Sequence, residues 1–154
     1  MTIVGIHAPL IDGSGRKVNW GLPSLHVIME DLEDLVRSER GEMLLIAGDL
    51  NVHPAHIPKS LFENFVDVIE VTASVRDPLL GCTNCGLGDE CGHLWTHKNG
   101  NSPNAAVQNI DYIFVSEALA EILSAAGGGS EVFPEVWDYS DHAPVIAEFG
   151  SEED

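Results

Sequence analysis

Carboxylates, an amide and two imidazoles follow short apolar runs at four places in the sequence. Carboxylate oxygens are the ligands that Mg²⁺ prefers, and an imidazolium stabilises negative charge as it builds on a phosphoryl oxygen. Each group alone is common, because Asp and Asn bond their own backbone in turns and a single His beside a strand is more often a surface or core residue. In chain order the candidates are His7, Asp49 with Asn51, Asp111, and Asp141 with His142.

Asp111 differs from the other candidates because it interrupts an otherwise apolar run, Ile110 to Val115. A carboxylate buried in such a strand needs a partner. His142 is the natural candidate, since a carboxylate orients and stabilises an imidazolium through one ring nitrogen. The second ring nitrogen is then free to donate to a phosphate oxygen.

A second group of candidate ligands lies between residues 82 and 97. These side chains are soft ligands that start with a C-x-x-C pair, a pattern that favours tetrahedral zinc. Three cysteines cannot all pair, which argues against a disulfide framework. A structural zinc that folds this stretch, reduced free cysteines and a redox role stay open as interpretations. The candidate zinc ligands are Cys82, Cys85, Cys91, His93 and His97.

The surrounding elements follow from the spacing of apolar residues. Apolar positions at helical spacing predict a helix over 23–40, and the continuous run 43–47 predicts a strand covered on both faces. Further strands are predicted at 2–6, 68–71, 110–115, 131–138 and 144–149, with helices at 59–66 and 116–126. Strands that alternate with helices favour a sheet with helices outside it. Residues 72–109 are predicted to be mostly loop, and so long a loop requires a local organiser such as a metal or a bound partner.

Length and charge limit the class of protein. The 154 residues are enough for one domain, expected over 1–150, with 151–154 as an acidic tail. No apolar run reaches the roughly 20 residues that cross a bilayer, and the opening residues lack a basic leader, so we expect a cytoplasmic protein. The net charge of −18 comes without a basic stripe, so tight duplex-DNA binding by this chain alone is not expected. The acidity fits solubility or a salty cytoplasm, and also attraction of divalent cations.

Three motifs in a fixed order resemble those of the endonuclease/exonuclease/phosphatase superfamily, which includes pancreatic-type DNases, sphingomyelinases and inositol-polyphosphate phosphatases. They are LLIAGDLN at 44–51, QNIDYIFVS at 108–116 and SDHAPV at 140–145. The segment His7-Ala8-Pro9 resembles the DNase-like form of a further family motif. The resemblance implies an α/β (α+β) fold, a four-layer αββα sandwich of the DNase I-like type, with its site at one end of two facing sheets.

The resemblance also implies roles for the candidate residues. Asp49 would orient or deprotonate the attacking water, and Asn51 would hold that water or the phosphate. His142, paired with Asp111, would donate to the phosphoryl oxygen as charge builds on it. His7 would stand near the leaving group as a second donor.

A divalent cation and a phosphate ester complete the implied chemistry. The cation would be Mg²⁺ or Mn²⁺, with Asp141 and Asp49 as its ligands. The activity implied is that of a metal-dependent phosphoric ester hydrolase, most simply a phosphodiesterase or nuclease-like enzyme. Nucleic acid, a phospholipid head group and a soluble ester all stay open as substrates.

One departure from the family pattern concerns the first half of the domain. Relatives supply an Asn and a metal-binding Glu well before the position of His7, and neither has a counterpart in this sequence. The chain is therefore interpreted as the C-terminal portion of the domain, with an N-terminal half expected in the full-length protein, and weak or no activity is expected of the chain alone. The alternatives are a non-catalytic half-domain that binds a partner or zinc, and an unrelated acidic metal-binding module.

Overall fold

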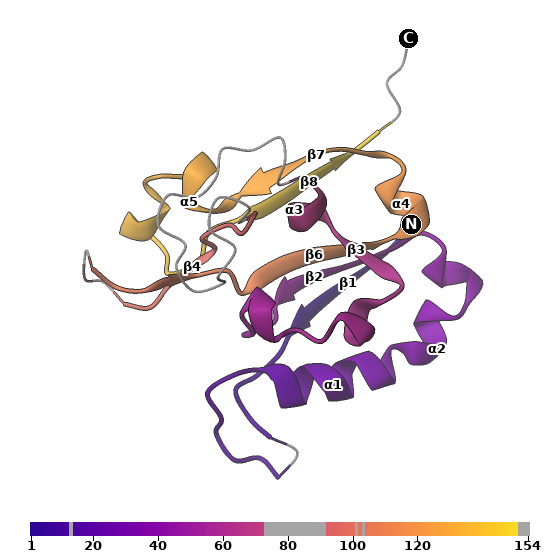
Figure 1. Ribbon diagram of the computed structural model, residues 1–154, viewed down its shortest axis with the longest axis horizontal. Helices are drawn as coiled ribbons and strands as arrows, with labels where there is room; N and C mark the ends of the chain where they lie inside the picture. The colour runs from indigo at the N-terminus through magenta and orange to yellow at the C-terminus, as the bar shows by residue number, and fades with distance from the viewer. Residues whose placement is uncertain (13, 73–91, 101, 103, 151–154) are drawn as a thin grey trace.

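A four-stranded sheet in the order β1-β2-β6-β3 lies at the centre of the computed structural model, which describes residues 1–12, 14–72, 92–100, 102 and 104–150 (Figure 1). β1 and β2 run parallel, whereas β6 runs antiparallel to β2 and to β3. The strands span Thr2–His7 (β1), Leu44–Asp49 (β2), Asp111–Ser116 (β6) and Phe65–Asp67 (β3).

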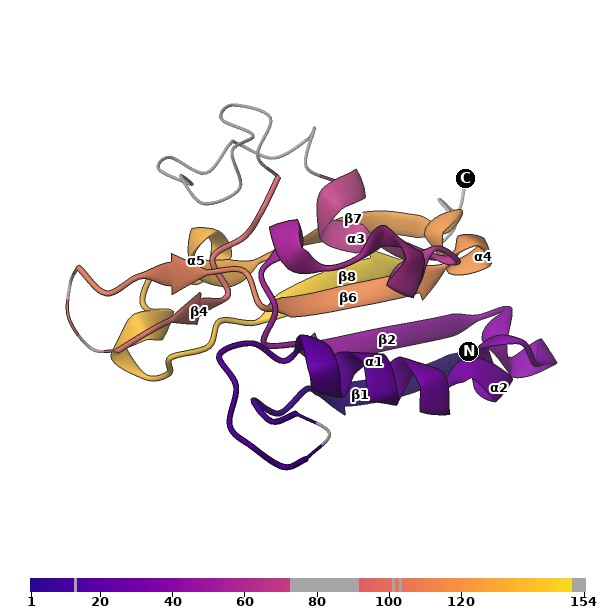
Figure 2. The same cartoon turned by 60° about the horizontal axis from the view of Figure 1, so that its bottom comes forward.

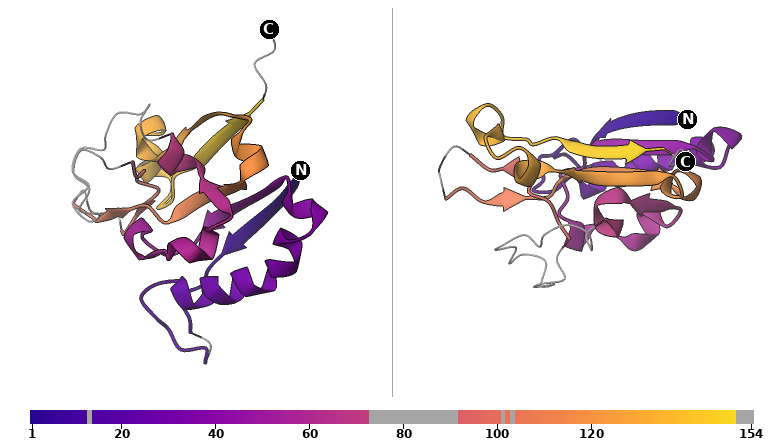
Figure 3. Two further views of the ribbon diagram at one scale, coloured as in Figure 1. Left: turned by 45° about the vertical axis from the view of Figure 1, so that its right-hand side comes forward. Right: turned by 90° about the horizontal axis from the view of Figure 1, so that it is seen from above.

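Two antiparallel pairs of strands accompany the central sheet. β7 (Leu123–Gly128) pairs with β8 (Val145–Phe149), and β4 (His97–Lys98) pairs with β5 (Val107–Gln108). The β7–β8 pair lies on one side of the central sheet and helix α1 (Leu22–Asp31) lies on the other (Figure 2). The β4–β5 pair extends beyond the end of the central sheet where β1 and β2 finish and β6 begins (Figures 1 and 3).

Alternate residues of each strand point to opposite sides of the central sheet. The inner strands β2 and β6 are covered on both faces, whereas every second residue of the edge strand β1 is exposed. On β2, Leu44 and Ile46 join the core beneath α1, while Leu45 joins the core shared with β7 and β8. On β6, Tyr112 and Phe114 face the α1 side. The prediction that the run 43–47 forms a strand covered on both faces is thus confirmed by β2. The layers are, in order, the helices, the central sheet and the β7–β8 sheet.

Short helices and 3₁₀ turns connect the strands. The predicted helix over 23–40 is present as α1 and a separate α2 (Glu33–Val36), and Leu25 of α1 is fully buried in the core. The other helices are α3 (Val68–Val71), α4 (Glu117–Ala120) and α5 (Gly129–Val132). The 3₁₀ turns span Glu39–Gly41, Pro54–His56, Lys59–Phe62 and Val136–Asp138. None of the helices in the described ranges is long and apolar enough to cross a membrane.

The helix predicted over 116–126 is wrong beyond its first turn. The structure has α4 only as far as Ala120, and the next residues form β7, which pairs with β8 from Leu123 to Gly128. Leu and Ala have high helical propensity, but pairing with an apolar neighbouring strand overrides that preference. The strand predicted over 131–138 is also wrong, because this stretch contains the end of α5 and a 3₁₀ turn.

Two shorter predictions are also corrected by the structure. The β-branched residues of 68–71 suggested a strand, yet they form α3, because the Asp67 carboxylate caps the helix by accepting from the backbone N–H groups of Ile69 and Glu70. The predicted helix over 59–66 is a 3₁₀ turn followed by the start of β3.

Candidate active site

Three polar side chains lie in one row across adjacent strands at the end of the central sheet. The register pairs His7 of β1 with Asp49 of β2, and Asp49 in turn with Asp111 of β6. Residues that are paired across strands project from the same face of a sheet. In all three strands this face is the one that carries the β7–β8 pair, since Leu45 and Ile113 have the same alternation and pack in that core.

The turn after β2 holds Asp49 in a fixed orientation. The Asn51 backbone N–H donates to Oδ1 of Asp49 at 2.8 Å, and the Asn51 side-chain amide donates to Oδ2 at 2.8 Å and to the Ala8 carbonyl at 3.2 Å. Asn51 adopts a left-handed conformation with φ of 51°, which Asn tolerates better than most residues. Nε2 of His7 lies 3.7 Å from Oδ2 of Asp49, and the His7 side chain is 68% exposed.

Asp111 and His142 form a hydrogen-bonded pair at the same end of the sheet. Nδ1 of His142 lies 3.1 Å from both carboxylate oxygens of Asp111, so that nitrogen donates and Nε2 is left for another partner. Burial raises the pKa of Asp111, while a hydrogen bond with Thr96 and the charge of His142 act in the opposite direction. Because Asp49 and Asp111 are cross-strand neighbours, the pair brings His142 to the Asp49 side of the molecule.

Thr96 connects the two halves of this pair, although it is not among the site residues predicted from the sequence. Its side chain is fully buried, and Oγ1 accepts the backbone N–H groups of Ile110 and Asp111, each at 3.1 Å. The Thr96 carbonyl accepts the N–H of Ala143 at 2.7 Å. Thr96 therefore positions both the strand that carries Asp111 and the turn that carries His142. The signal available in the sequence is that Trp95-Thr96 resembles, in reversed order, a Thr-Trp pair of the family.

Tyr112 and Asn109 tie β6 to the loop that follows Asp49. The Tyr112 hydroxyl donates to the Val52 carbonyl at 2.7 Å and also lies 3.1 Å from the Asn109 carbonyl. Oδ1 of Asn109 accepts the N–H of Leu94 at 2.9 Å. Burial raises the pKa of Tyr112 well above its ordinary value, so the hydroxyl keeps its proton. These buried bonds hold the Asp49 loop and the Asp111 strand as one unit.

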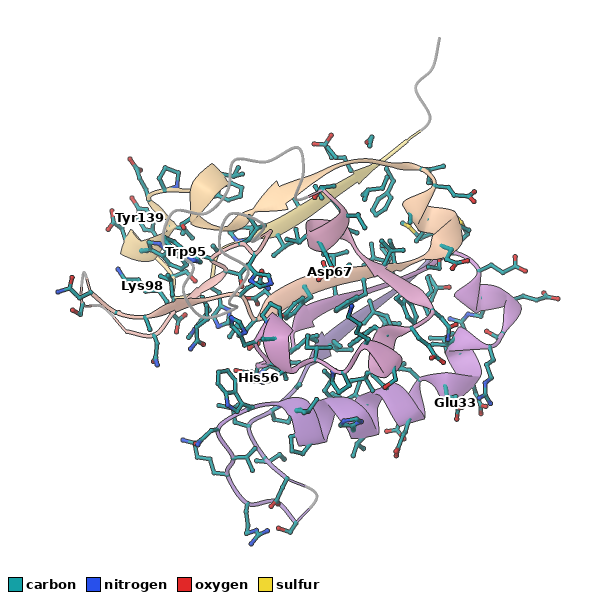
Figure 4. All side chains as sticks on the ribbon, in the orientation of Figure 1. Glu33, His56, Asp67, Trp95, Lys98 and Tyr139 are labelled. Carbon is teal, nitrogen blue, oxygen red and sulfur yellow. The ribbon has the colours of Figure 1, made fainter. Side chains whose placement is uncertain are left out.

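His97 on β4 lies against His142. The two residues face one another in an isolated antiparallel bridge, and their ring centroids are 4.7 Å apart. The Asp141 carbonyl accepts the N–H of Lys98 at 2.9 Å, which holds this turn beside β4. Burial lowers the pKa of His97 and so does His142, whereas Asp141, Asp111 and Asp49 act to raise it. Trp95 and Lys98, which flank Thr96 and His97, mark this end of the molecule in Figure 4.

The donor set at this end fits a divalent cation, although its members are not all the expected ones. Ligand atoms of His97, Asp141 and His142 all lie within 4.8 Å of one another. Asp141 is exposed, as an ion ligand open to solvent should be. Asp49, the second expected metal ligand, already accepts a hydrogen bond from Asn51 at each of its carboxylate oxygens. The structure thus brings Asp141 together with two imidazoles.

The predicted zinc site lies largely outside the described residues. Cys82, Cys85 and Cys91 belong to that part of the chain, so the zinc interpretation stays a prediction. Of the two histidines in that set, His93 packs edge-on against the His53 ring at 5.7 Å, and His97 lies with Asp141 and His142.

A pocket of about 380 Å³ lies beside the turn that carries Asp141 and His142. Its lining is mainly apolar and comes from α5 and the segment that leads to β8. Tyr139, two residues before Asp141, is 86% exposed, and its ring is available for contact with a bound molecule. The lining residues are Val132, Phe133, Pro134, Glu135, Val136, Tyr139 and Pro144.

Two solved structures share the fold of this chain. A 3′ phosphatase, NExo from Neisseria bound to a product DNA hairpin, is 18% identical with a TM-score of 0.65, and an AP endonuclease from Archaeoglobus fulgidus is 16% identical with a TM-score of 0.65. Each likeness covers 97% of this chain and 61% of the other, so the chain spans about three fifths of their length. These likenesses confirm the predicted fold class.

Sequence comparison gives the family. Among curated proteins no match was found. The sequence profile of the Endonuclease/Exonuclease/phosphatase family matches residues 23–142, which is most of the chain and includes Asp49, Asp111 and His142. The members of this family are hydrolases of phosphate esters, and the chain belongs to the endonuclease/exonuclease/phosphatase family.

Proposed function

We propose that this chain carries the catalytic site of a divalent-metal-dependent phosphoesterase, most simply a phosphodiesterase that uses water. One observation carries the proposal: Asp49 and Asp111 are paired across β2 and β6, and His142 is bonded to Asp111. A carboxylate for water and an imidazole for phosphate therefore lie on one face at one end of a rigid sheet. Family membership supports the reaction class.

Asp49 is the group that orients or deprotonates the attacking water. Its carboxylate is fixed by two hydrogen bonds from Asn51, so its remaining lone pairs point in defined directions. His7, 3.7 Å from the same carboxylate and largely exposed, is the second donor, near the leaving group. Positioning of this kind reduces the entropy lost in bringing water to phosphorus.

His142 donates from Nε2 to a phosphoryl oxygen as negative charge builds there. Asp111 accepts from Nδ1, which sets the tautomer and stabilises the imidazolium. Removal of one such donor typically costs on the order of 10²-fold or more in rate. A divalent cation, Mg²⁺ or Mn²⁺, held by Asp141 with Asp49 near it, would supply further charge stabilisation at the phosphoryl group when bound.

The structural relatives and the net charge each favour particular classes of substrate. One structural relative is a 3′ phosphatase bound to product DNA and the other is an AP endonuclease, which favours a nucleic-acid phosphoester over a phospholipid head group or another soluble ester. The net charge of −18 opposes a long contact with duplex phosphates, which favours a short or single-stranded substrate. The apolar pocket at Tyr139 would receive the non-phosphate part of such a substrate.

Single-turnover hydrolysis tests this proposal even if turnover is slow. The chain, in excess over bis-p-nitrophenyl phosphate with Mg²⁺ or Mn²⁺, is compared with the Asp49→Ala and His142→Ala variants. Both variants are expected to lose about 10²-fold in rate or to fall to the metal-only background, with the fold unchanged, because each removes transition-state stabilisation and no core packing. His26→Ala and Asp34→Ala, exposed on α1 and α2, are matched controls. Equal rates in all five proteins would contradict the assignment.

The share of its structural relatives that the chain covers favours one alternative to the phosphoesterase function. Because the chain spans 61% of the length of these relatives, a non-catalytic half-domain that binds a partner or zinc is the alternative function. Absence of any hydrolysis above background, in both metals, would favour this alternative.

A further inference from the structure

We propose that His97, Asp141 and His142 form a transition-metal site of two imidazoles and one carboxylate, which takes Mn²⁺ or a softer divalent ion in preference to Mg²⁺. The site assigns a ligand role to His97, which the proposed chemistry does not use. Its relevance to hydrolysis rests on the proposed function, whereas binding of the ion does not.

The positions of the three side chains suit one ion. One ligand atom from each lies within 4.8 Å of the others, and the backbone bridge between His97 and His142 fixes the two rings at 4.7 Å. Ligands on opposite sides of an ion lie about 4 Å apart when each bond is about 2.1 Å. Asp141 is exposed, so a change of its side-chain rotamer can bring its carboxylate closer to the two rings.

His142 makes the kind of hydrogen bond to a carboxylate that metal-binding histidines usually make. Such a histidine almost always donates its other ring N–H to a carboxylate, which fixes the ring and raises its basicity. Nδ1 of His142 has this bond to Asp111 at 3.1 Å. Thr96 in turn holds the Asp111 backbone and, through its carbonyl, the N–H of Ala143. The ligand is therefore oriented before any ion arrives.

His97 carries an unexplained polar atom. Its Nδ1 is buried and, within the described part of the chain, has no hydrogen-bond partner. A buried polar atom without a partner costs free energy, and a bound ion is one of the physical explanations for such an atom in a native protein. A metal ion bonded to this imidazole gives the ring a polar partner that the described side chains do not supply.

Local charge favours a cation, and the donor atoms favour a particular kind. Three carboxylates, those of Asp49, Asp111 and Asp141, act electrostatically on the His97 ring. Imidazole nitrogens suit Zn²⁺, Ni²⁺, Fe²⁺ and Cu²⁺, and Mn²⁺ accepts them more readily than Mg²⁺, which prefers water and carboxylate oxygens. Since His142 has one free nitrogen, the ion and the phosphoryl oxygen of the proposed function compete for it, and the proposed site is that of the chain without substrate.

Mn²⁺ binding, followed by electron paramagnetic resonance, tests this site without any assay of activity. Mn²⁺ is the probe because thiolates, including those of the cysteines outside the described residues, compete poorly for it. Pulsed spectra of the bound ion are expected to show coupling to histidine ¹⁴N. His97→Ala is expected to raise the Kd for Mn²⁺ by about tenfold or more and Asp111→Asn to raise it by a similar factor, the range found for lost supporting groups.

His26→Ala, an exposed histidine on α1, is the matched control and should leave the affinity unchanged. Bound Mn²⁺ without ¹⁴N coupling would overturn the proposal and indicate a site of oxygen ligands alone. A Kd for His97→Ala within twofold of the control, or no Mn²⁺ binding by the parent chain, would overturn it as well. The ¹⁴N spectrum of the parent decides the matter even if a variant fails to fold. Nitrogen-bound Mn²⁺ without hydrolysis would support this site and refute the proposed function. Hydrolysis without nitrogen-bound Mn²⁺ would support the proposed function and refute this site.

Discussion

Asn51 both shapes the turn after β2 and holds the Asp49 side chain. It follows Asp49 at the end of β2, adopts a left-handed backbone, and uses its amide to bond the Asp49 carboxylate. Gly-Asp-x-Asn is common in ordinary turns, so the motif alone gave little information. What distinguishes this turn is its place in the sheet, opposite Asp111 of the neighbouring strand.

Two substitutions separate the roles of Asn51. Asn51→Gly removes the amide but accepts the left-handed backbone, whereas Asn51→Ala removes the amide and strains it, by about 1 kcal/mol. Unfolding in urea is therefore expected to show Asn51→Ala about 1 kcal/mol less stable than Asn51→Gly, with an equal loss of hydrolysis in both. If the two variants were equally stable, the left-handed turn would not be a constraint on this position.

The residues of the site differ in how well the sequence revealed them. Asp111 was recognisable because a carboxylate within an apolar strand needs a partner, and His142 was the right partner in space. Thr96 and the position of His97 were not recognisable from the sequence, because β4 has only two residues and therefore no periodicity. The position of β4 is set by its contacts with Gln108 and His142, which come later in the chain. Their environment exists only once the chain has folded.

At the scale of elements, the parallel pair β1–β2 aligns His7 with Asp49, and Gly48 permits it. Gly48 has φ of 146°, and a Cβ built there would lie 1.8 Å from the Ile6 carbonyl oxygen. A side chain at this position would push β1 away from β2, one residue before Asp49. The close approach of the two strands is therefore part of the site.

Gly48→Ala is expected to lower the free energy of unfolding by at least about 2 kcal/mol, because neither the backbone conformation nor the neighbouring carbonyl accommodates the methyl group. Gly5→Ala on β1 is the control, since a Cβ there meets nothing within 4 Å. Its effect should stay within about 0.5 kcal/mol. Chemical denaturation measures both, and similar small effects for the two variants would contradict the close packing of β1 on β2.

His53, in the loop after β2, is expected to make the free energy of unfolding depend on pH. Burial lowers the pKa of His53, and its neighbour His56 adds to this, with the His93 ring also close. Nδ1 of His53 accepts the N–H of Ala55 at 3.2 Å, which requires the neutral ring. The pKa of His53 is lower in the folded state than its ordinary value of 6.5. The stability that the neutral ring contributes is therefore fully present when the pH is above 6.5, and it is lost as the pH falls from there through the lowered pKa.

His53→Asn keeps a side-chain acceptor but removes the titrating group. Between pH 7.5 and pH 5, as test conditions, the parent is expected to lose more of its free energy of unfolding than the variant does. Urea unfolding at both pH values measures the difference. Identical losses would show that His53 does not titrate within the folded protein.

The elements also show where local sequence patterns fail. The central strands were predictable because β2 and β6 are continuous apolar runs buried on both faces. Leu123–Gly128 has the composition of a helix end, and it is a strand only because β8 pairs with it. Val68–Val71 has the composition of a strand, and it is a helix because Asp67 caps it and Val68 and Ile69 are buried on one side. Both errors arise where tertiary contacts outweigh propensity.

At the scale of the whole molecule, charge opposes a polyanionic substrate. The chain has 25 acidic and seven basic residues, and a nucleic-acid phosphoester is the substrate class proposed for it. If the substrate is nucleic acid, encounter with it is slowed by repulsion between like charges, and salt screens that repulsion.

The rate on duplex DNA is therefore expected to rise with added salt at low ionic strength, in contrast to basic nucleases, whose affinity falls. Measurement of kcat/KM at about 10 mM and about 100 mM salt covers a change in screening length from about 30 Å to about 10 Å. The rate on bis-p-nitrophenyl phosphate, with one negative charge, should change much less. A steep fall with salt on DNA would show a local basic contact that the net charge conceals.

The central claim is that the Asp49 turn and the Asp111–His142 pair serve one phosphate. Titration of the chain with inorganic phosphate in the presence of Mg²⁺, followed by NMR, tests it directly. The His142 ring signals and the Asn51 side-chain amide signals are predicted to shift along a single binding curve, with the His26 ring unaffected. Separate curves for His142 and Asn51, or a His142 signal that moves no more than that of His26, would contradict a shared site.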